Sequence, residues 1–91
     1  HPRHAVACAE LAELLDGHGH EEGALRAWRL LHSLQPAAAV PLRETGRLLG
    51  RRGRLAEAVG YLERACRRAP EDATARALLA ETWLRLGDAP F

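Results

Sequence analysis

The chain has 91 residues, of which 47% are hydrophobic and 27% are charged, and its formal net charge is +1. This composition predicts one small folded domain and argues against a disordered segment. A net charge so close to zero gives no general attraction to nucleic acid or to an anionic membrane. All thirteen basic residues are arginine, so the arginine content alone is weak evidence for an anion-binding function.

The sequence has no apolar run of about 18 residues and no signal peptide, which predicts a protein without a transmembrane helix. It begins with His1 rather than with methionine, so we expect it to be part of a longer protein. Cys8 and Cys66 are too few for a disulfide-rich secreted domain. We therefore expect two free thiols on helices and a reducing, cytoplasmic location.

Apolar residues recur at helical spacing and predict five helices and no β-strand. The expected helices cover residues 5–16, 21–34, 39–51, 54–69 and 72–86. Pro36 and Pro70 follow the second and fourth helices, and Asp72 is the expected N-cap of the fifth. In the first helix the apolar residues close to helical spacing are Val6, Leu11, Leu14 and Leu15. Those of the next three helices are Ala24, Leu25, Trp28, Leu31 and Leu34, then Leu42, Leu48 and Leu49, then Leu55, Ala58, Val59, Leu62, Ala65 and Cys66.

Two kinds of residue that end helices recur with a period of 34 residues. They are the prolines Pro2, Pro36 and Pro70 and the glycines Gly19, Gly53 and Gly87. Other positions agree at the same offset, including Ala5/Ala39/Ala73, Leu14/Leu48, Leu15/Leu49 and Ala24/Ala58. A shared period of this length indicates structural units that stack on one another.

At these positions the chain resembles the tetratricopeptide repeat (TPR) family, whose 34-residue unit is a helix–turn–helix. The first copy matches its pattern at Ala24, Trp28 and Pro36, the second at Gly46, Leu49, Ala58, Leu62, Ala65 and Pro70, and the third at Ala80 and Trp83. The family's opening tryptophan is replaced by Cys8, Leu42 and Arg76, and Thr45 stands where leucine is usual. The resemblance implies an all-α, right-handed α-solenoid of five helices, with repeats at about 5–38 and 39–72 and a partial repeat at 73–91.

Small residues in the repeat predict where paired helices approach closely. Ala12 and Gly46 lie on the first helix of a pair, and Ala24 and Ala58 lie on the second. Large residues are expected to fill the space beside them, namely Trp28, Leu62 and Trp83. The fifth helix should cover the fourth and leave a partly apolar outer face among Leu78, Leu79, Trp83 and Leu86. We interpret that end as a truncated edge or a self-association surface, with Trp83 and Leu79 as its contacts.

The stretch GHGHEE (17–22) fits either a metal site or a turn between two helices. At an offset of 34 it aligns with RRGRLA (51–56), so that Gly19 falls on Gly53 and the histidines fall on arginines. A metal site would have no matching ligands in the second copy, and a stable site needs three or four ligands. We therefore favour a turn with its polar residues in water and expect no bound metal.

Residues that could carry catalysis are few. Cys8 occupies a helix-packing position, Cys66 has no histidine placed to act as its base, and Ser33 and His32 point in different directions on one helix. No phosphate-binding glycine loop and no metalloprotease motif occurs. The sequence therefore predicts a protein that is not an enzyme and that binds no cofactor.

By family analogy, the first helices of the stacked pairs line one concave wall. Its positions in the three copies are Val6, Ala9, Glu13 and Asp16, then Val40, Arg43, Arg47 and Arg51, then Thr74, Ala77, Glu81 and Arg85. We expect partner contacts at Glu13, Arg43, Arg47, Arg51, Glu81 and Arg85. The arginines form a row at i, i+4 and i+8 that could hold an acidic peptide or a C-terminal carboxylate. Alternatively, Glu13, Arg47 and Glu81, which share one offset, pair with each other and only stabilise the fold.

The resemblance implies a non-catalytic protein-interaction module that presents its concave face to a peptide or a partner helix. The alternative is a structural spacer or self-association segment of a larger protein, with no specific peptide ligand. The chain has no lysine or asparagine for the chaperone-tail clamp of some TPR proteins, so we expect another kind of partner. The GRRGR stretch (50–54) is short and lacks interleaved aromatic residues, so we expect no nucleic acid partner.

Overall fold

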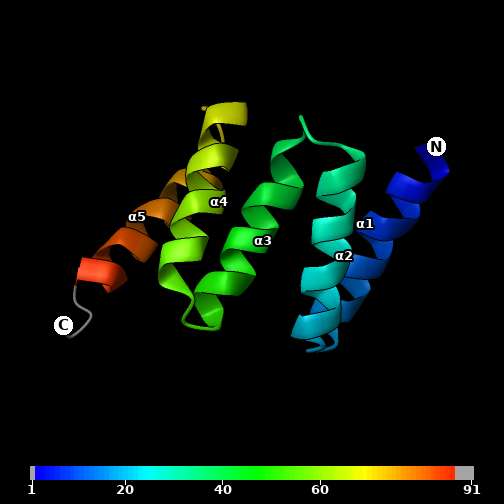
Figure 1. Cartoon of the computed structure of the whole chain (residues 1–91), viewed down its shortest axis with the longest axis horizontal. Coiled ribbons are helices and arrows are strands. Elements are labelled where there is room, and N and C mark those ends of the chain that lie inside the picture. Colours follow the sequence, from blue (N-terminus) through cyan, green and yellow to red (C-terminus); the bar gives the residue numbers. More distant parts are fainter. Residues whose placement is uncertain (1, 88–91) are drawn as a thin grey trace.

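The computed structural model describes residues 2–87 and places five α-helices in them (Figure 1). They are α1 (Pro2–Gly17), α2 (Glu21–Leu34), α3 (Ala39–Arg51), α4 (Leu55–Arg68) and α5 (Ala73–Gly87). No strand occurs among the described residues. The all-helical prediction is confirmed, and the expected bounds of α2 and α3 agree with the structure. The end of the expected third repeat, residues 88–91, lies outside the described part.

The helices form a row in which each one packs mainly on its neighbours in sequence. The pairs α1–α2 and α3–α4 make the most extensive contacts, and α2–α3 and α4–α5 join the pairs. Figure 1 shows α2 in front of α1 and α4 in front of α5, with the two ends of the chain at opposite ends of the row. The molecule is correspondingly elongated, 44 × 28 × 18 Å. This arrangement is a helical solenoid of antiparallel hairpins.

The turns within the two hairpins have the same geometry. Gly19 and Gly53 both have φ of +79°, a left-handed conformation that glycine adopts without strain. His20 N–H donates to the carbonyl of Leu15 over 2.8 Å, and Arg54 N–H donates to that of Leu49 over 3.0 Å. These bonds satisfy carbonyls that the helix end would otherwise leave open. The GHGH stretch is therefore a helix-ending turn, as its alignment with the second copy predicted.

The turns between successive hairpins also repeat. Ala38 N–H donates to the Gln35 carbonyl over 3.1 Å, and Asp72 N–H donates to the Ala69 carbonyl over 3.0 Å. In the second of these turns Asp72 also caps α5, because its carboxylate accepts from the N–H groups of Thr74 and Ala75 at 3.0 and 3.2 Å. This confirms the expected N-cap and fixes where α5 begins.

The core lies along the contact between the helices of each hairpin. Ala12, Ala24 and Ala58 are fully buried, and Trp28 and Leu62 fill the space beside them. A Cβ on Gly46 would lie 2.6 Å from Leu62 Cγ and 3.3 Å from the carbonyl oxygen of Ala58. Glycine at position 46 therefore lets α3 approach α4 more closely than any other residue would allow. The sequence-based prediction of small residues at these contacts is confirmed.

Three of the four apolar residues whose spacing predicted α1 lie outside the core. Val6, Leu11 and Leu14 are exposed, and α1 instead buries Ala5 and Ala12 against α2. Leu14 is 60% exposed, whereas Leu48, its equivalent in α3, is completely buried. The cause is position in the row: α3 packs on both α2 and α4, but within residues 2–87 α1 packs only on α2.

At the other end of the row, the expectation that Trp83 fills core space is wrong. Trp83 is 49% exposed and Leu84 is 71% exposed, while α5 buries Ala75 and Thr82. Leu49, the equivalent of Trp83 in α3, is buried in the core. The predicted apolar outer face is confirmed, with Leu84 as a member that the sequence-based prediction omitted.

None of the helices in the described region is long and apolar enough to cross a membrane.

Candidate interaction surface

The arginine row of α3 lies against carboxylates from other parts of the chain. The Nη2 of Arg47 donates to Asp16 Oδ2. It also donates to Glu44 Oε1 over 3.1 Å. Asp16 belongs to the last turns of α1, so Arg47 connects the first hairpin to the second. Its side chain is only 22% exposed, which limits the screening of this ion pair by water.

Arg43 makes the equivalent connection toward α5. Its Nη1 donates to Asp72 Oδ2 over 2.8 Å, and its Nε donates to Glu44 Oε2 over 3.3 Å. The hydrogen bond from Arg43, followed by that from the Ala75 N–H, lowers the pKa of Asp72 below its ordinary value. Asp72 therefore caps α5 and ties it to α3 through one carboxylate.

Arg51 lies at the outer end of the row and is held more loosely. Its side chain is 58% exposed, with Nε 3.4 Å from Glu21 Oε2 and Nη1 3.8 Å from Asp16 Oδ1. For Arg43 and Arg47, burial by itself would lower the pKa, but the hydrogen bonds to carboxylates outweigh it and raise both pKa values. The row therefore has two firmly paired members and one that solvent reaches.

The six residues predicted as partner contacts on the concave wall fall into two groups in the structure. Arg43, Arg47 and Arg51 share one row, but among the described residues neither Glu13 nor Glu81 forms an ion pair with Arg47. Glu13, Glu81 and Arg85 are exposed on α1 and α5. The guanidinium of Arg85 comes within 3.8 Å of the position that a Cβ on Gly50 would take. Structural pairing of the row is thus present, with Asp16, Glu44 and Asp72 in place of the expected acids.

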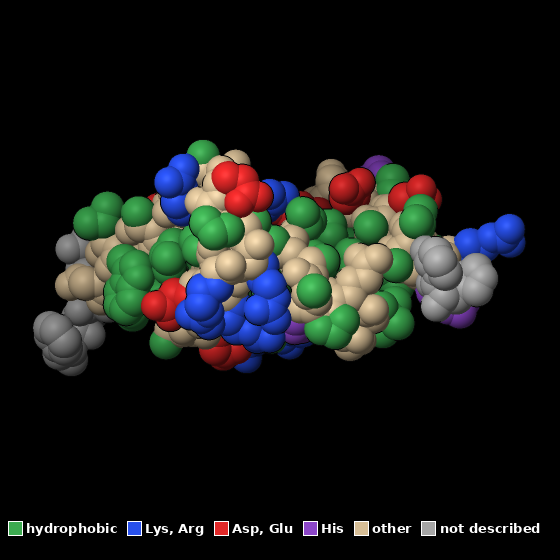
Figure 2. Space-filling view, turned by 90° about the horizontal axis from the view of Figure 1, so that it is seen from above, with side chains coloured by type: hydrophobic (Ala, Val, Ile, Leu, Met, Phe, Trp, Pro, Cys, Tyr) green, Lys and Arg blue, Asp and Glu red, His purple; other side chains and the backbone are tan. Residues whose placement is uncertain are grey.

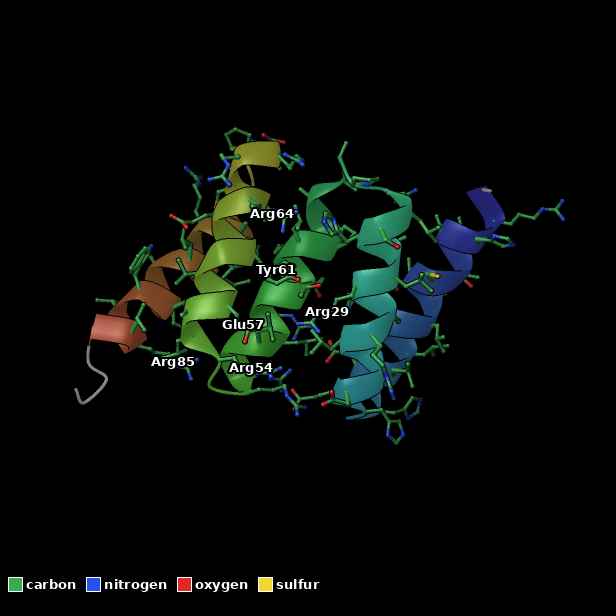
Figure 3. All side chains as sticks on the ribbon, in the orientation of Figure 1. Arg29, Arg54, Glu57, Tyr61, Arg64 and Arg85 are labelled. Carbon is green, nitrogen blue, oxygen red and sulfur yellow. The ribbon has the colours of Figure 1, made fainter. Side chains whose placement is uncertain are left out.

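A second set of polar contacts joins α2 to α4 (Figure 3). Arg29 of α2 lies 3.9 Å from Glu57 of α4, which also lies 3.7 Å from Arg54. Nearer the C-terminal end of α4, Arg64 lies within 3.0 Å of His32 and 5.6 Å from the centre of the Tyr61 ring. The sequence analysis did not connect His32 with Arg64. One signal was available, because Arg64 has no acidic residue three or four positions away on its own helix.

The remaining candidates for chemistry lie apart from both sets. Cys8 on α1 and Cys66 on α4 are partly buried free thiols, as the sequence predicted. His18 and His20 of the first turn are exposed. Within residues 2–87 no three His, Cys, Asp or Glu side chains gather in a way that could hold a metal ion.

The repeated hairpins, their matching turns and the ion pairs between them define a helical-repeat protein. A family profile described as tetratricopeptide repeat matches residues 39–82, which contain α3, α4 and most of α5. No curated protein matches the chain. The match and the five-helix solenoid together are consistent with a repeat of the tetratricopeptide type. Repeats of this type are typically non-catalytic, and they indicate a protein-interaction module.

Proposed function

We propose that the chain is a non-catalytic module that presents the side formed by α1, α3 and α5 to a peptide or a partner helix. Its repeats would cover about 5–38 and 39–72, with a partial repeat at 73–91. The observation that carries this proposal is the set of ion pairs by which Arg47 reaches Asp16 and Arg43 reaches Asp72. These contacts tie α3 to α1 and α5, so a partner would meet a preformed surface and lose little entropy on binding.

Exposed side chains on these three helices are the proposed contacts. Val6 and Val40 occupy equivalent positions on α1 and α3 and are both more than 40% exposed. Glu13, Arg51, Glu81 and Arg85 lie further along these helices and carry charges that solvent reaches. We assign Arg43 and Arg47 a supporting role, in which they hold the surface and offer only their remaining N–H donors. The two free thiols fit a reducing compartment such as the cytoplasm.

A peptide selection tests this assignment. Peptides selected from a random displayed library against the immobilised chain would be measured by fluorescence anisotropy against Val6→Glu/Val40→Glu. We expect at least a 10-fold loss of affinity, because the two changes place charge at exposed positions without removing core contacts. The matched control is Leu30→Glu/Leu34→Glu, which makes the same change at exposed positions of α2. Equal losses in the two variants, or a loss only in the control, would refute the assigned surface.

The exposed apolar end of α5 supports a second candidate function, self-association. Trp83 and Leu84 are large and exposed at positions whose counterparts in α3, Leu49 and Gly50, are buried. Sedimentation velocity over a range of concentrations would detect a dimer. Trp83→Ala should abolish it while leaving the helical content unchanged, because the side chain contributes little to the core. A monomer at every concentration would reject this candidate.

A further inference from the structure

Three arginines near the C-terminal end of α4 lack acidic partners. Arg64, Arg67 and Arg68 form no ion pair with any carboxylate of residues 2–87, although six other arginines do. Arg64 instead meets the imidazole of His32 at 3.0 Å, and Arg68 donates to the carbonyl oxygen of Pro36 over 3.3 Å. Three positive charges therefore lie close together here without an ion pair, although Glu63 and Glu71 are near them in the sequence.

The arrangement brings like charges together. Arginines three and four residues apart on one helix face repel each other. The helix dipole offsets part of this for Arg67 and Arg68, which lie in the last turn, but Arg64 lies a turn earlier. Figure 2, which views the row from the side on which α4 ends, shows basic side chains gathered in one patch beside a histidine, with acidic side chains at its margin.

The imidazole of His32 lies beside these arginines and is partly buried. Burial, then Arg64, then Arg68 lower its pKa below the ordinary value. A neutral ring can accept a hydrogen bond from Arg64 at Nε2, and its Nδ1 is then a buried donor, one that has no partner among the described residues. The folded chain therefore satisfies this group of cations with weak, uncharged acceptors only.

Arg64 is also held in a defined orientation. Its guanidinium lies 5.6 Å from the centre of the Tyr61 ring, within the range of a cation–π contact. Figure 3 shows Tyr61 and Arg64 on the same side of α4. Only its contact with His32 uses a donor of this guanidinium within residues 2–87, so other N–H groups remain for a ligand. A pre-oriented guanidinium of this kind suits two-point recognition of a carboxylate.

We propose that His32, Arg64, Arg67 and Arg68 form a docking site for the carboxylates of an acidic peptide segment in a protein partner. Arg64 and Arg68 are one helical turn apart, about 6 Å, which matches the spacing of about 6.6 Å between alternate residues of an extended peptide. A peptide fits better than a nucleic acid because Arg64 lies over one face of Tyr61 and the ring also packs against the core, which disfavours base stacking on it. The site lies between α2 and α4 and does not depend on the α1–α3–α5 surface.

The test uses a fluorescein-labelled decapeptide of alternating glutamate and serine, measured by fluorescence anisotropy at about 50 mM salt. Arg64→Gln/Arg67→Gln/Arg68→Gln should weaken its binding at least 10-fold. The matched control, Arg26→Gln/Arg52→Gln/Arg54→Gln, removes the same number of positive charges from exposed positions in the first half of α2 and in the turn before α4, and it should stay within twofold of wild type. Thermal unfolding followed by circular dichroism would check that both variants are folded.

Three results would overturn the proposal. Equal weakening in the two variants would show that only net charge matters. Tighter binding of a single-stranded oligonucleotide of the same charge would assign the patch to nucleic acid. Failure of the acidic peptide to bind more tightly than its glutamine-for-glutamate version would exclude carboxylate recognition. None of these results bears on the surface assigned to α1, α3 and α5.

Discussion

The arginines of α3 and those of α4 have the same spacing and opposite surroundings. Arg43 and Arg47 are four residues apart, as are Arg64 and Arg68. The α3 pair contacts Glu44 of its own helix, Asp16 of α1 and the α5 cap Asp72, whereas the α4 pair contacts an imidazole and a backbone carbonyl. The difference teaches that the spacing of like charges on a helix does not define a binding row. The partners that the fold supplies decide whether arginines hold helices together or remain available for a ligand.

The largest effect predicted for a single substitution concerns the close approach of α3 to α4, on which the ion pairs of α3 depend. Gly46→Ala should lower the free energy of unfolding by about 2–3 kcal/mol, because the new Cβ would lie 2.6 Å from Leu62 and near the backbone of α4. Chemical denaturation measures the loss. Gly60→Ala is the control, since its Cβ would meet nothing within 4 Å, and it should stabilise α4 by about 0.5–1 kcal/mol. A neutral Gly46→Ala would show that the two helices can separate without loss.

A somewhat smaller effect is expected at Asp72, where the α3 pair meets the cap of α5. Asp72→Ala removes both the cap and the partner of Arg43, and we expect a loss of about 2 kcal/mol. Asp72→Asn keeps a capping oxygen and should lose about half as much. Urea denaturation of the two variants separates the contributions. Equal losses would mean that the ion pair with Arg43 adds nothing to the cap.

Acidification offers an independent view of the same carboxylate. The pKa of Asp72 is lowered in the folded chain. The contribution of its carboxylate to the free energy of unfolding is therefore present above the ordinary pKa of 3.8 and is lost as the pH falls below that value. The fall in unfolding free energy between pH 4 and lower pH should therefore be shallower in Asp72→Asn than in wild type.

The smallest predicted effect lies at His32, beside the α4 pair. Its pKa is lowered in the folded chain from 6.5, so the unfolded chain binds more protons just below that value. The contribution of neutral His32 to the free energy of unfolding should be fully present above pH 6.5. It should decrease as the pH falls through that value. His32→Gln should flatten this part of the profile of unfolding free energy against pH. His18→Gln, in the exposed first turn, is the control and should keep the wild-type slope.

The fold was largely predictable because its signals are local. Periodic apolar residues placed α2 and α3 correctly, and the glycines at 19 and 53 located two turns of identical geometry. The exposure of Leu14 was not predictable in the same way. Periodicity tells which residues share a face of a helix, but it does not tell whether another helix covers that face.

The candidate sites were only half predictable for a related reason. The α3 row follows from spacing, and Glu44 lies within one turn of it. Asp16 and Asp72, however, are 31 and 29 residues from their partners, and only the packed hairpins bring them together. The α4 patch could have been suspected because no acid lies three or four residues from Arg64, but its contact with His32 also depends on tertiary packing.

The most direct test compares the free energies of unfolding of two matched double variants, Arg43→Gln/Arg47→Gln and Arg64→Gln/Arg68→Gln. Each removes two charges four residues apart from one helix. The account predicts a loss of about 2–4 kcal/mol for the α3 variant, because three partly buried carboxylates lose their partners, and a change within about 0.5 kcal/mol for the α4 variant. Equal losses, or a larger loss in the α4 variant, would contradict it.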